Sequence, residues 1–507
     1  MFIEMKKLVV GLDFGSDSAR AALIDSGDGH ILATSSMNYP LWQEGKFCDA
    51  SKSQYRQSPS DYLCVLSHIL TEVIKMKPSD SEIVAIGVDT TASTPCMLDK
   101  DFKFIADDDP DAMFILWKDH TGIDESKHIT EVSQKYLSHS GGVYSAENYW
   151  SKVLHVVEKN DAVASKAFYA IEQCDFIPWV LTGNLRPSRC AATCKQMWDS
   201  RYGFPPVEYF NQFGEKMAEL AANLPENTYL SQEICGALST EWAKKLNLGG
   251  NVIVSVGNID AHSGAVGAGC SMDTMVLNLG TSACIMAVGP HQEQIKGVFA
   301  QAEDIIIPGY SGYEMGLSSF GDNFAWVSRM IGKSIASLSD EASSIENSNY
   351  IPLCTDWFNG RRTPSPDSSA SASILGLTMS TTPAELFWGI VEGSCFGIKA
   401  IIDHLSDNGV RPEHLVAIGG VSLKSPFIMQ MLADVTGREI EVSSAKESCA
   451  QGAAMNAAVA AGLYGNLQEA QKAMCQPLLT KYCPRKGCSH DERYQRYREL
   501  YNLKKDI

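Results

Sequence analysis

The 507-residue sequence contains neither of the two common glycine-rich phosphate motifs. No G-x4-G-K-[ST] segment occurs, and no G-x-G-x-x-G opens a helix, which argues against P-loop and Rossmann-type nucleotide binding. No apolar run approaches the roughly 18 residues needed to cross a bilayer, and the first residues predict no signal peptide. Basic residues are outnumbered, giving a net charge of −18. Nucleic acid and anionic membranes are therefore not expected as partners.

The fifteen cysteines show no spacing typical of a disulfide framework, and several lie in runs of apolar or small residues. We interpret them as small buried side chains in a reducing compartment, which predicts a cytoplasmic protein. The densest group is Cys483, Cys488 and His490, whose spacing differs from that of common zinc sites.

The length of the chain predicts two large domains rather than one core.

Residues 8–25 are the most informative segment, and they predict a strand, a tight turn and a second strand. Gly15, Ser16 and Ser18 form the turn, where small side chains let backbone N–H groups approach a nucleotide phosphate. Asp13, at the exit of the first strand, is suited to hold a hard cation that bridges to the phosphate. An ordinary β-hairpin is the alternative interpretation of this segment taken alone.

The same pattern returns about half a chain later, where Gly280, Thr281 and Ser282 separate two apolar runs. An internal duplication at this distance predicts two similar lobes, each offering a phosphate-facing turn to a shared central cleft. We expect residues 1–268 to form one domain with the first hairpin, and residues 269–507 to form a second domain with the second hairpin.

Local signals outline further elements of a mixed-sheet α/β fold. Ser60 is placed to cap a helix, and Thr382 and Glu385 form a capping box that predicts a helix to about residue 404. Gly419 and Gly420 directly follow a predicted strand, and the next helix opens at Ser425. These glycines, with Gly452 at a later helix start, predict a pocket for the nucleotide base. A plain strand-to-helix turn is the alternative.

Asp260 and His262 follow another predicted strand, just before the second hairpin. Phosphoryl transfer to an alcohol requires positioning, a metal ion and a base that accepts the hydroxyl proton. Asp260 fits the role of that base, with a helix N-cap as the alternative. His262 is better explained as a structural histidine.

The combination of residues 11–20 (GLDFGSDSAR), Gly257-x-x-Asp260-x-His262, residues 280–282 (GTS) and Gly419-Gly420 resembles the FGGY family of carbohydrate kinases. The resemblance covers nearly the whole chain. It implies the actin/hexokinase/Hsp70-type fold, with two ribonuclease-H-like domains around a central cleft. The resemblance further implies that residues 1–268 form the sugar-binding domain and residues 269–507 the nucleotide-binding domain. Five stretches are most similar to bacterial members that act on L-ribulose, namely residues 12–18, 47–50, 113–121, 314–322 and 356–364.

The resemblance implies a role for individual residues. Asp260 would be the catalytic base and a sugar contact, and Asp13 would lie near the metal. Residues 280–282 would line the phosphates, and Gly419, Gly420 and Ser425 would line the adenine. Ala92, Lys195 and Glu314 match the family's sugar pocket, while Trp117 and Asp119 lie in a segment that packs near the substrate in sister kinases.

The implied activity is transfer of a phosphoryl group from ATP, with Mg²⁺, to the terminal hydroxyl of L-ribulose, a step of L-arabinose catabolism. The partners are then a small sugar and ATP, and a homodimer stays open as the assembly. One alternative is a kinase of D-ribulose, xylulose or ribitol. A more remote one is a nucleotide-switch protein of the actin/Hsp70 type, which would not need an acid at position 260.

Overall fold

The computed structural model describes residues 5–345, 351–367 and 369–500. The chain folds into two compact units. The first contains residues 1–269, 302–311 and 447–475, and the second contains residues 270–301, 312–446 and 476–507. A single boundary near residue 268 therefore does not describe the chain fully, because residues 447–475 pack with the first unit. Among the described helices, none combines the length and apolar character needed to cross a membrane.

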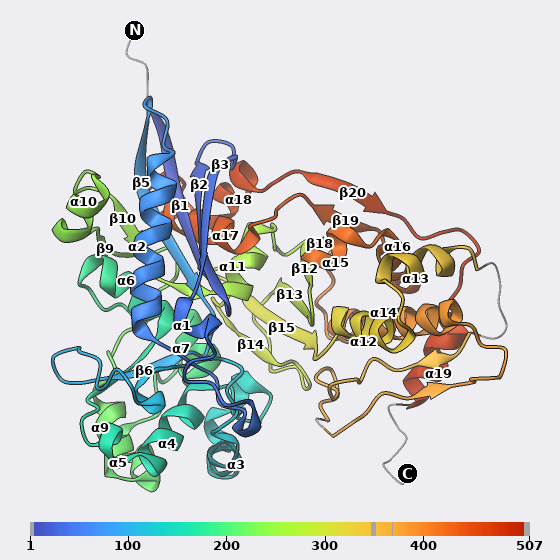
Figure 1. Ribbon diagram of the computed structural model, residues 1–507, viewed down its shortest axis with the longest axis horizontal. Coiled ribbons are helices and arrows are strands. Elements are labelled where there is room, and N and C mark those ends of the chain that lie inside the picture. The colour runs from blue at the N-terminus through green and yellow to red at the C-terminus, as the bar shows by residue number, and fades with distance from the viewer. Residues whose placement is uncertain (1–4, 346–350, 368, 501–507) are drawn as a thin grey trace. The chain divides into compact units, whose positions relative to one another are not determined.

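The sheet of the first unit has the order β3-β2-β1-β5-β10-β9, with β11 beside β5 (Figure 1). β1, β2 and β3 are antiparallel neighbours, whereas β5 and β10 continue the sheet in parallel. The strands are β1 (Lys6–Phe14), β2 (Ser18–Asp25), β3 (Ile31–Asn38), β5 (Ser81–Thr90), β9 (Ile234–Ala237), β10 (Ile253–Ser255) and β11 (Asn258–Ile259). The first predicted hairpin is thus β1 and β2.

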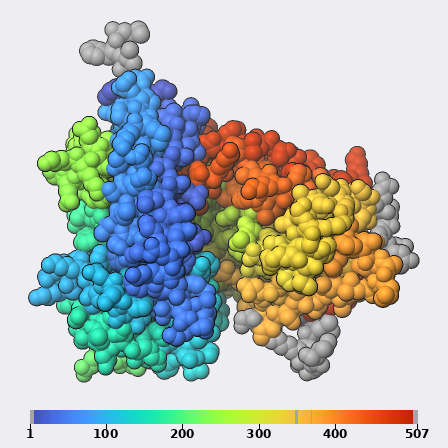
Figure 2. Space-filling view, in the orientation of Figure 1, coloured from blue at the N-terminus to red at the C-terminus, as the bar shows by residue number. Residues whose placement is uncertain are grey.

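Alternate residues of β1 face opposite sides of this sheet, as strand geometry requires. Leu8, Val10 and Leu12 enter the apolar core that the sheet shares with α2 (Pro59–Lys75). The outward side of α2 forms part of the blue surface of the first unit in Figure 2. The residue that caps α2 is Ser58, whose side chain accepts from the Ser60 N–H, so the cap lies two residues before the predicted one.

The opposite face of the sheet packs very closely against α17 (Ser448–Ala460). A Cβ added to Gly11 would lie 1.7 Å from the Ala450 carbonyl oxygen, and one added to Gly87 would lie 1.9 Å from that of Ala453. Glycine is required on both strands because the helix backbone occupies the space of a side chain. Other helices of this unit are α3 (Ile123–Val132), α4 (Tyr149–Lys159), α6 (Gln173–Thr182), α7 (Arg189–Lys195), α9 (Glu215–Ala222), α10 (Thr240–Leu246), α11 (Asp260–Gly267) and α18 (Leu467–Met474).

The sheet of the second unit repeats this order as β15-β13-β12-β18-β19-β20, with β14 at the edge beside β15. β18 and β19 are again parallel to the first strand, and the last strand is again antiparallel. The strands are β12 (Thr274–Leu279), β13 (Ala283–Gly289), β14 (Ala300–Glu303), β15 (Ser311–Leu317), β18 (His414–Ile418), β19 (Ile440–Ser443) and β20 (Leu478–Tyr482). The duplicated, ribonuclease-H-like order confirms the predicted fold class.

The long helix α14 (Pro383–Asp407) carries much of the second unit's core, packed with α16 (Pro426–Thr436) and the sheet. The predicted capping box is present: the Thr382 hydroxyl accepts from the Glu385 N–H, and the Glu385 carboxylate accepts from the Thr382 N–H. The remaining helices include α12 (Gly321–Ile331), α13 (Ile335–Ser343), α15 (Gly420–Lys424) and α19 (Asp491–Leu500). The sequence predicts that this last helix runs from Asp491 to Lys504, and residues 501–504 lie outside the described residues.

Candidate active site

Two aspartates stand side by side at the carboxyl ends of parallel strands in the first unit. Asp13 on β1 and Asp89 on β5 are partners in the strand register. Both share the strand face of Gly11 and Gly87, so they lie on the side covered by α17. Open α/β sheets bind ligands at the carboxyl ends of their parallel strands. The register therefore creates an acidic pair where a substrate or metal site is expected.

The charge of this pair is only partly balanced. Arg20 on β2 places Nε 3.3 Å from the Asp13 carboxylate and also donates to Glu447 at 2.8 Å. Burial raises the pKa of Asp13 despite the opposing charge of Arg20. Burial, with the negative charges of Asp13 and Asp260, raises the pKa of Asp89 well above its usual range. A bound cation would relieve this repulsion.

The acidic pair fits a hard divalent cation such as Mg²⁺. Both carboxylate oxygens of Asp89 are buried without a hydrogen-bond partner among the described residues. Carboxylate oxygens are the ligands that Mg²⁺ takes from proteins, and it keeps several waters beside them. Asp13 was predicted as a metal residue, and Asp89 was not. The signal for Asp89 was available, because it is an acid at the end of a buried strand.

Asp260 is the first residue of α11, directly after β11, and β11 pairs in parallel with β5. Its side chain is half-buried, and Oδ1 accepts from the N–H of Ala261 at 2.6 Å. The residue before it, Ile259, occupies the N-cap position, so Asp260 is not the N-cap itself. The charge of Asp260 acts on Asp89. Three carboxylates are thus gathered at one end of the sheet.

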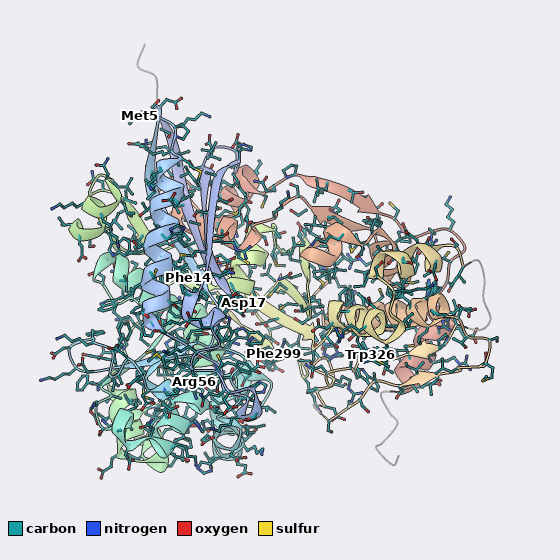
Figure 3. All side chains as sticks on the ribbon, viewed as in Figure 1. Met5, Phe14, Asp17, Arg56, Phe299 and Trp326 are labelled. Atoms are coloured by element: carbon teal, nitrogen blue, oxygen red, sulfur yellow. The ribbon has the colours of Figure 1, made fainter. Side chains whose placement is uncertain are left out.

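The first predicted phosphate turn is held by several side chains. The Gly15 N–H donates to the Ser18 carbonyl at 3.0 Å and closes the turn. The Trp117 indole N–H donates to the Ser16 hydroxyl at 2.9 Å, and Trp42 donates to Asp17 at 2.7 Å. Figure 3 labels Phe14 at the end of β1 and Asp17 in this turn. The polar atom of Trp117 therefore braces the turn, a role that the sequence did not suggest.

Ala92 and Lys195 lie on different elements of the first unit. Ala92 follows β5 and is half-buried, and Lys195 ends α7 with 6% of its surface exposed. Two residues that the sequence did not single out hold the segment after Ala92 in place through hydrogen bonds. Lys152 donates to the carbonyl oxygens of Ser93 at 2.6 Å and Leu116 at 2.8 Å.

The second of these residues is Glu172, which accepts from the Ser93 hydroxyl and, at 2.8 Å, from the Thr94 N–H. Burial lowers the pKa of Lys152 to about 7, and burial raises that of Glu172. Nothing in the local sequence marks either residue, because their importance depends on contacts with strands far away along the chain.

Asp119 makes an extensive set of contacts within the protein, and its contact with the substrate stays a prediction. It is fully buried, and its Oδ2 lies 2.9 Å from Arg56 Nε and accepts from the Tyr55 N–H at 2.7 Å. Its Oδ1 accepts from the N–H and the hydroxyl of Thr121 at 3.0 and 2.6 Å. Arg56, labelled in Figure 3, is also fully buried. Both oxygens of Asp119 are thus committed to the protein.

The second predicted phosphate turn joins β12 to β13. Thr281 and Ser282 are exposed, and the Thr281 carbonyl accepts from the N–H groups of Phe320 and Asp322, at the start of α12, at 2.8 and 3.1 Å. These hydrogen bonds fix the turn to the start of α12. Gly280 is half-buried and closes the turn by donating to the Ser282 carbonyl at 3.0 Å.

Gly419 and Gly420 join β18 to α15, and Ser425 stands between α15 and α16. Gly419 has a φ of 93°, and a Cβ there would lie 2.6 Å from the Leu279 carbonyl oxygen. It therefore lies against the end of β12, close in sequence to the Gly280 turn. A Cβ on Gly420 would meet nothing within 4 Å. Open space over a glycine at a helix start suits the approach of a flat base.

Gly452 packs closely against a neighbouring helix, and its place in the nucleotide pocket stays a prediction. It lies inside α17 in the first unit and is buried. A Cβ at this position would lie 1.8 Å from the Ser263 carbonyl oxygen on α11. The backbone of α11 therefore occupies the space that a side chain at this position would need.

Glu314 lies on β15 of the second unit, half-buried, with Cys284 Sγ 3.8 Å from its carboxylate. The strand around it is tied to the 356–364 segment, because Thr363 exchanges two hydrogen bonds with the backbone of Gly316 at 2.8 and 3.0 Å. Figure 3 labels Phe299 and Trp326 in this unit.

The sequence also groups Cys483, Cys488 and His490 near the C-terminus. The His490 side chain is paired with Glu392 at 2.8 Å, so this imidazole has a structural partner.

Two models of one protein family together match most of the chain. The N-terminal domain of the FGGY family of carbohydrate kinases matches residues 8–267, and the C-terminal domain of the same family matches residues 275–461. The chain therefore belongs to the FGGY family of carbohydrate kinases.

Individual relatives show which members of this family the chain is similar to. A ribulokinase from Vibrio parahaemolyticus is 35% identical, with 97% of this chain and 95% of the relative aligned. One from Halalkalibacterium halodurans is 32% identical over 98% and 94% of the two chains. The fold is shared with a xylulose kinase from Lactobacillus acidophilus (TM-score 0.84, 20% identity, 98% of each chain) and with a Plasmodium falciparum glycerol kinase (TM-score 0.80, 18% identity, 98% and 97%).

Proposed function

We propose that this protein transfers the γ-phosphoryl group of ATP to the terminal hydroxyl of L-ribulose, giving L-ribulose 5-phosphate. The reaction class rests on one observation above all: Asp260 begins α11 beside the Asp13–Asp89 pair at the carboxyl ends of parallel strands. The choice of sugar rests on the ribulokinases to which the chain is similar over nearly its full length. A place in L-arabinose catabolism and a cytoplasmic location are part of the proposal.

In this mechanism Asp260 accepts the proton of the attacking hydroxyl. The transition state of phosphoryl transfer is loose, so a carboxylate of ordinary basicity suffices as the base. Asp13, with Asp89 beside it, would hold Mg²⁺, which supplies charge neutralisation at the phosphates when it is bound. The Gly15–Ser18 and Gly280–Ser282 turns offer backbone N–H groups to the phosphates. Gly419, Gly420 and Ser425 contact the base.

Sugar recognition in the proposal depends on Ala92, Lys195 and Glu314. A pentulose offers only hydroxyls and one carbonyl, and discrimination comes from buried groups that stay unpaired when the wrong isomer binds. Lys195→Ala should raise KM for L-ribulose about ten- to a hundredfold, since a lost hydrogen bond to a charged group is worth roughly 1.5–3 kcal/mol. Lys166→Ala, an exposed lysine of the same unit, is the matched control and should leave KM unchanged.

The decisive test is Asp260→Asn, which keeps the shape of the side chain and removes its basic oxygen. Loss of a general base costs about 10²–10⁴ in rate, so kcat should fall by that factor while ATP and sugar still bind in calorimetry. Asp273→Asn, an exposed aspartate, is the control. If Asp260→Asn kept more than about a tenth of the parental kcat, well above that range, the base would be another residue.

The substrate assignment is tested separately by comparing kcat/KM for L-ribulose, D-ribulose, D-xylulose, ribitol and glycerol. L-Ribulose should be the best substrate. A higher kcat/KM for xylulose or glycerol than for either ribulose would assign the protein to another sugar within the same family.

A further inference from the structure

Two cysteines and a histidine meet inside the first unit, outside the residues that the proposed reaction uses. Cys190 and Cys194 are both on α7, and their four-residue spacing puts them on one face of that helix. His262 is the third residue of α11. The Nδ1 atom of His262 lies 2.7 Å from the Sγ atom of Cys190. One ligand atom from each of the three side chains lies within 4.8 Å of the others.

This Cys–Cys–His group is closed off from solvent and carried by rigid elements. The exposed fractions are 2% for Cys190, 8% for Cys194 and 0% for His262. Both cysteines are thiols. Among the described residues, this is the one cluster of at least three Cys, His, Asp or Glu side chains with such mutual distances. Sites built on helices hold their geometry better than sites on loops.

We propose that Cys190, Cys194 and His262 form a binding site for Zn²⁺. Thiolate and imidazole are ligands for thiophilic cations, whereas Mg²⁺ and Ca²⁺ take oxygen, so the acidic pair and this group select different metals. Two thiolates balance the charge of one Zn²⁺, which matters in a buried position. Binding releases the two thiol protons to the buffer, and a water completes the fourth position.

The distances are close to those that zinc requires. With Zn–S near 2.3 Å and Zn–N near 2.0–2.1 Å, two tetrahedral ligand atoms lie about 3.5–3.8 Å apart. Cys190 and His262 are now nearer than that, at 2.7 Å, so zinc binding moves these two atoms apart by under about 1 Å. The change is within the range of side-chain adjustment and needs no rearrangement of α7 or α11.

The position of the zinc site gives it a consequence for the enzyme. Cys194 immediately precedes Lys195, and His262 lies two residues after Asp260. Ligation would therefore fix the end of α7, with its proposed sugar contact, to the start of α11, with the proposed base. This consequence rests on the proposed function, whereas zinc binding itself does not. We expect zinc loading to change KM for the sugar more than kcat.

Zinc binding is tested on the full chain after treatment with a chelator. Zn²⁺ alone, titrated against a chromogenic chelator, should bind with one ion per chain. Co²⁺ alone should bind at the same site and show the sulfur-to-cobalt charge-transfer absorption of thiolate ligands. This readout needs no variant and no kinase activity, so it separates failure of the zinc site from failure of the proposed function.

Cys194→Ala removes one ligand and keeps the Cys190–His262 contact. It should weaken Zn²⁺ binding by at least about a hundredfold, more than the loss of an outer-shell partner, and abolish the cobalt band. Cys235→Ala, a buried cysteine on β9 of the same unit, is the matched control and should bind zinc like the parent. Absence of the cobalt band in the unmodified protein, or an unchanged zinc affinity in folded Cys194→Ala, would overturn the proposal.

Discussion

The buried contacts of Asp119 lead to a prediction with a definite magnitude. Asp119→Asn replaces one carboxylate oxygen by an NH2 group. In the folded protein, Oδ2 faces both Arg56 Nε at 2.9 Å and the Tyr55 N–H at 2.7 Å. If the NH2 group takes the place of Oδ2, it faces two other hydrogen-bond donors. In either orientation of the amide, the buried guanidinium of Arg56 loses its counter-charge. Removing one partner of a buried ion pair costs about 3–5 kcal/mol.

The loss should appear as a lower melting temperature. The specific entropy of unfolding implies a shift of somewhat under 2 °C per kcal/mol for a unit of about 300 residues, so Tm should fall by roughly 5–8 °C. Circular dichroism during heating, with urea unfolding at 25 °C, measures the change. Sugar kinetics, measured well below the transition, should keep the parental KM, because neither oxygen of Asp119 is available to the substrate.

Two further variants distinguish the loss of the Arg56–Asp119 ion pair from the loss of a substrate contact. Asp111→Asn removes the other acid near Arg56, at 3.5 Å and partly exposed, and should cost less than about 1 kcal/mol. Combining Arg56→Met with Asp119→Asn removes both charges and should recover part of the lost stability. A variant Asp119→Asn with parental stability and a raised KM for the sugar would refute this reasoning and return Asp119 to the substrate site.

Three other outcomes are expected. Gly452→Ala should destabilise the first unit by several kcal/mol in urea unfolding, because its Cβ would lie 1.8 Å from the Ser263 carbonyl oxygen; an unchanged midpoint would contradict the packing role. Asp13→Asn should lower turnover strongly while calorimetry without nucleotide shows unchanged sugar binding; an equal loss of sugar affinity would point to another role. Burial raises the pKa of Asp356 to about 6, so its folded form holds a proton more tightly and stability is lost as pH rises from about 4 through 6. Asp356→Asn should remove up to about 3 kcal/mol of that loss in unfolding series across this range, and an unchanged slope would refute the assignment.

The sequence by itself determined the elements whose signals are local. The two strand–turn–strand segments, the capping box at Thr382 and the glycines after β18 all appear where they were predicted, because turns and caps depend on residues a few positions apart. The repeated hairpin also predicted the internal duplication, and the matching strand orders of the two sheets show it. Even so, the cap of α2 is Ser58 and not Ser60, because the helix already begins at Pro59, a residue suited to the first helical position.

Only the tertiary structure decided which role each buried polar residue takes. Asp13 and Asp89 are neighbours because two parallel strands pair in one register, and Asp119 has a buried partner because Arg56 lies against it. Gly452 packs against the Ser263 carbonyl oxygen of α11, a contact that the residues around it in the sequence do not indicate. The cost of burying a charge or a backbone group depends on the partner it finds, and that partner is usually far away along the chain. The type of each residue can be read from the sequence, whereas the residue that it contacts is decided by how the chain packs.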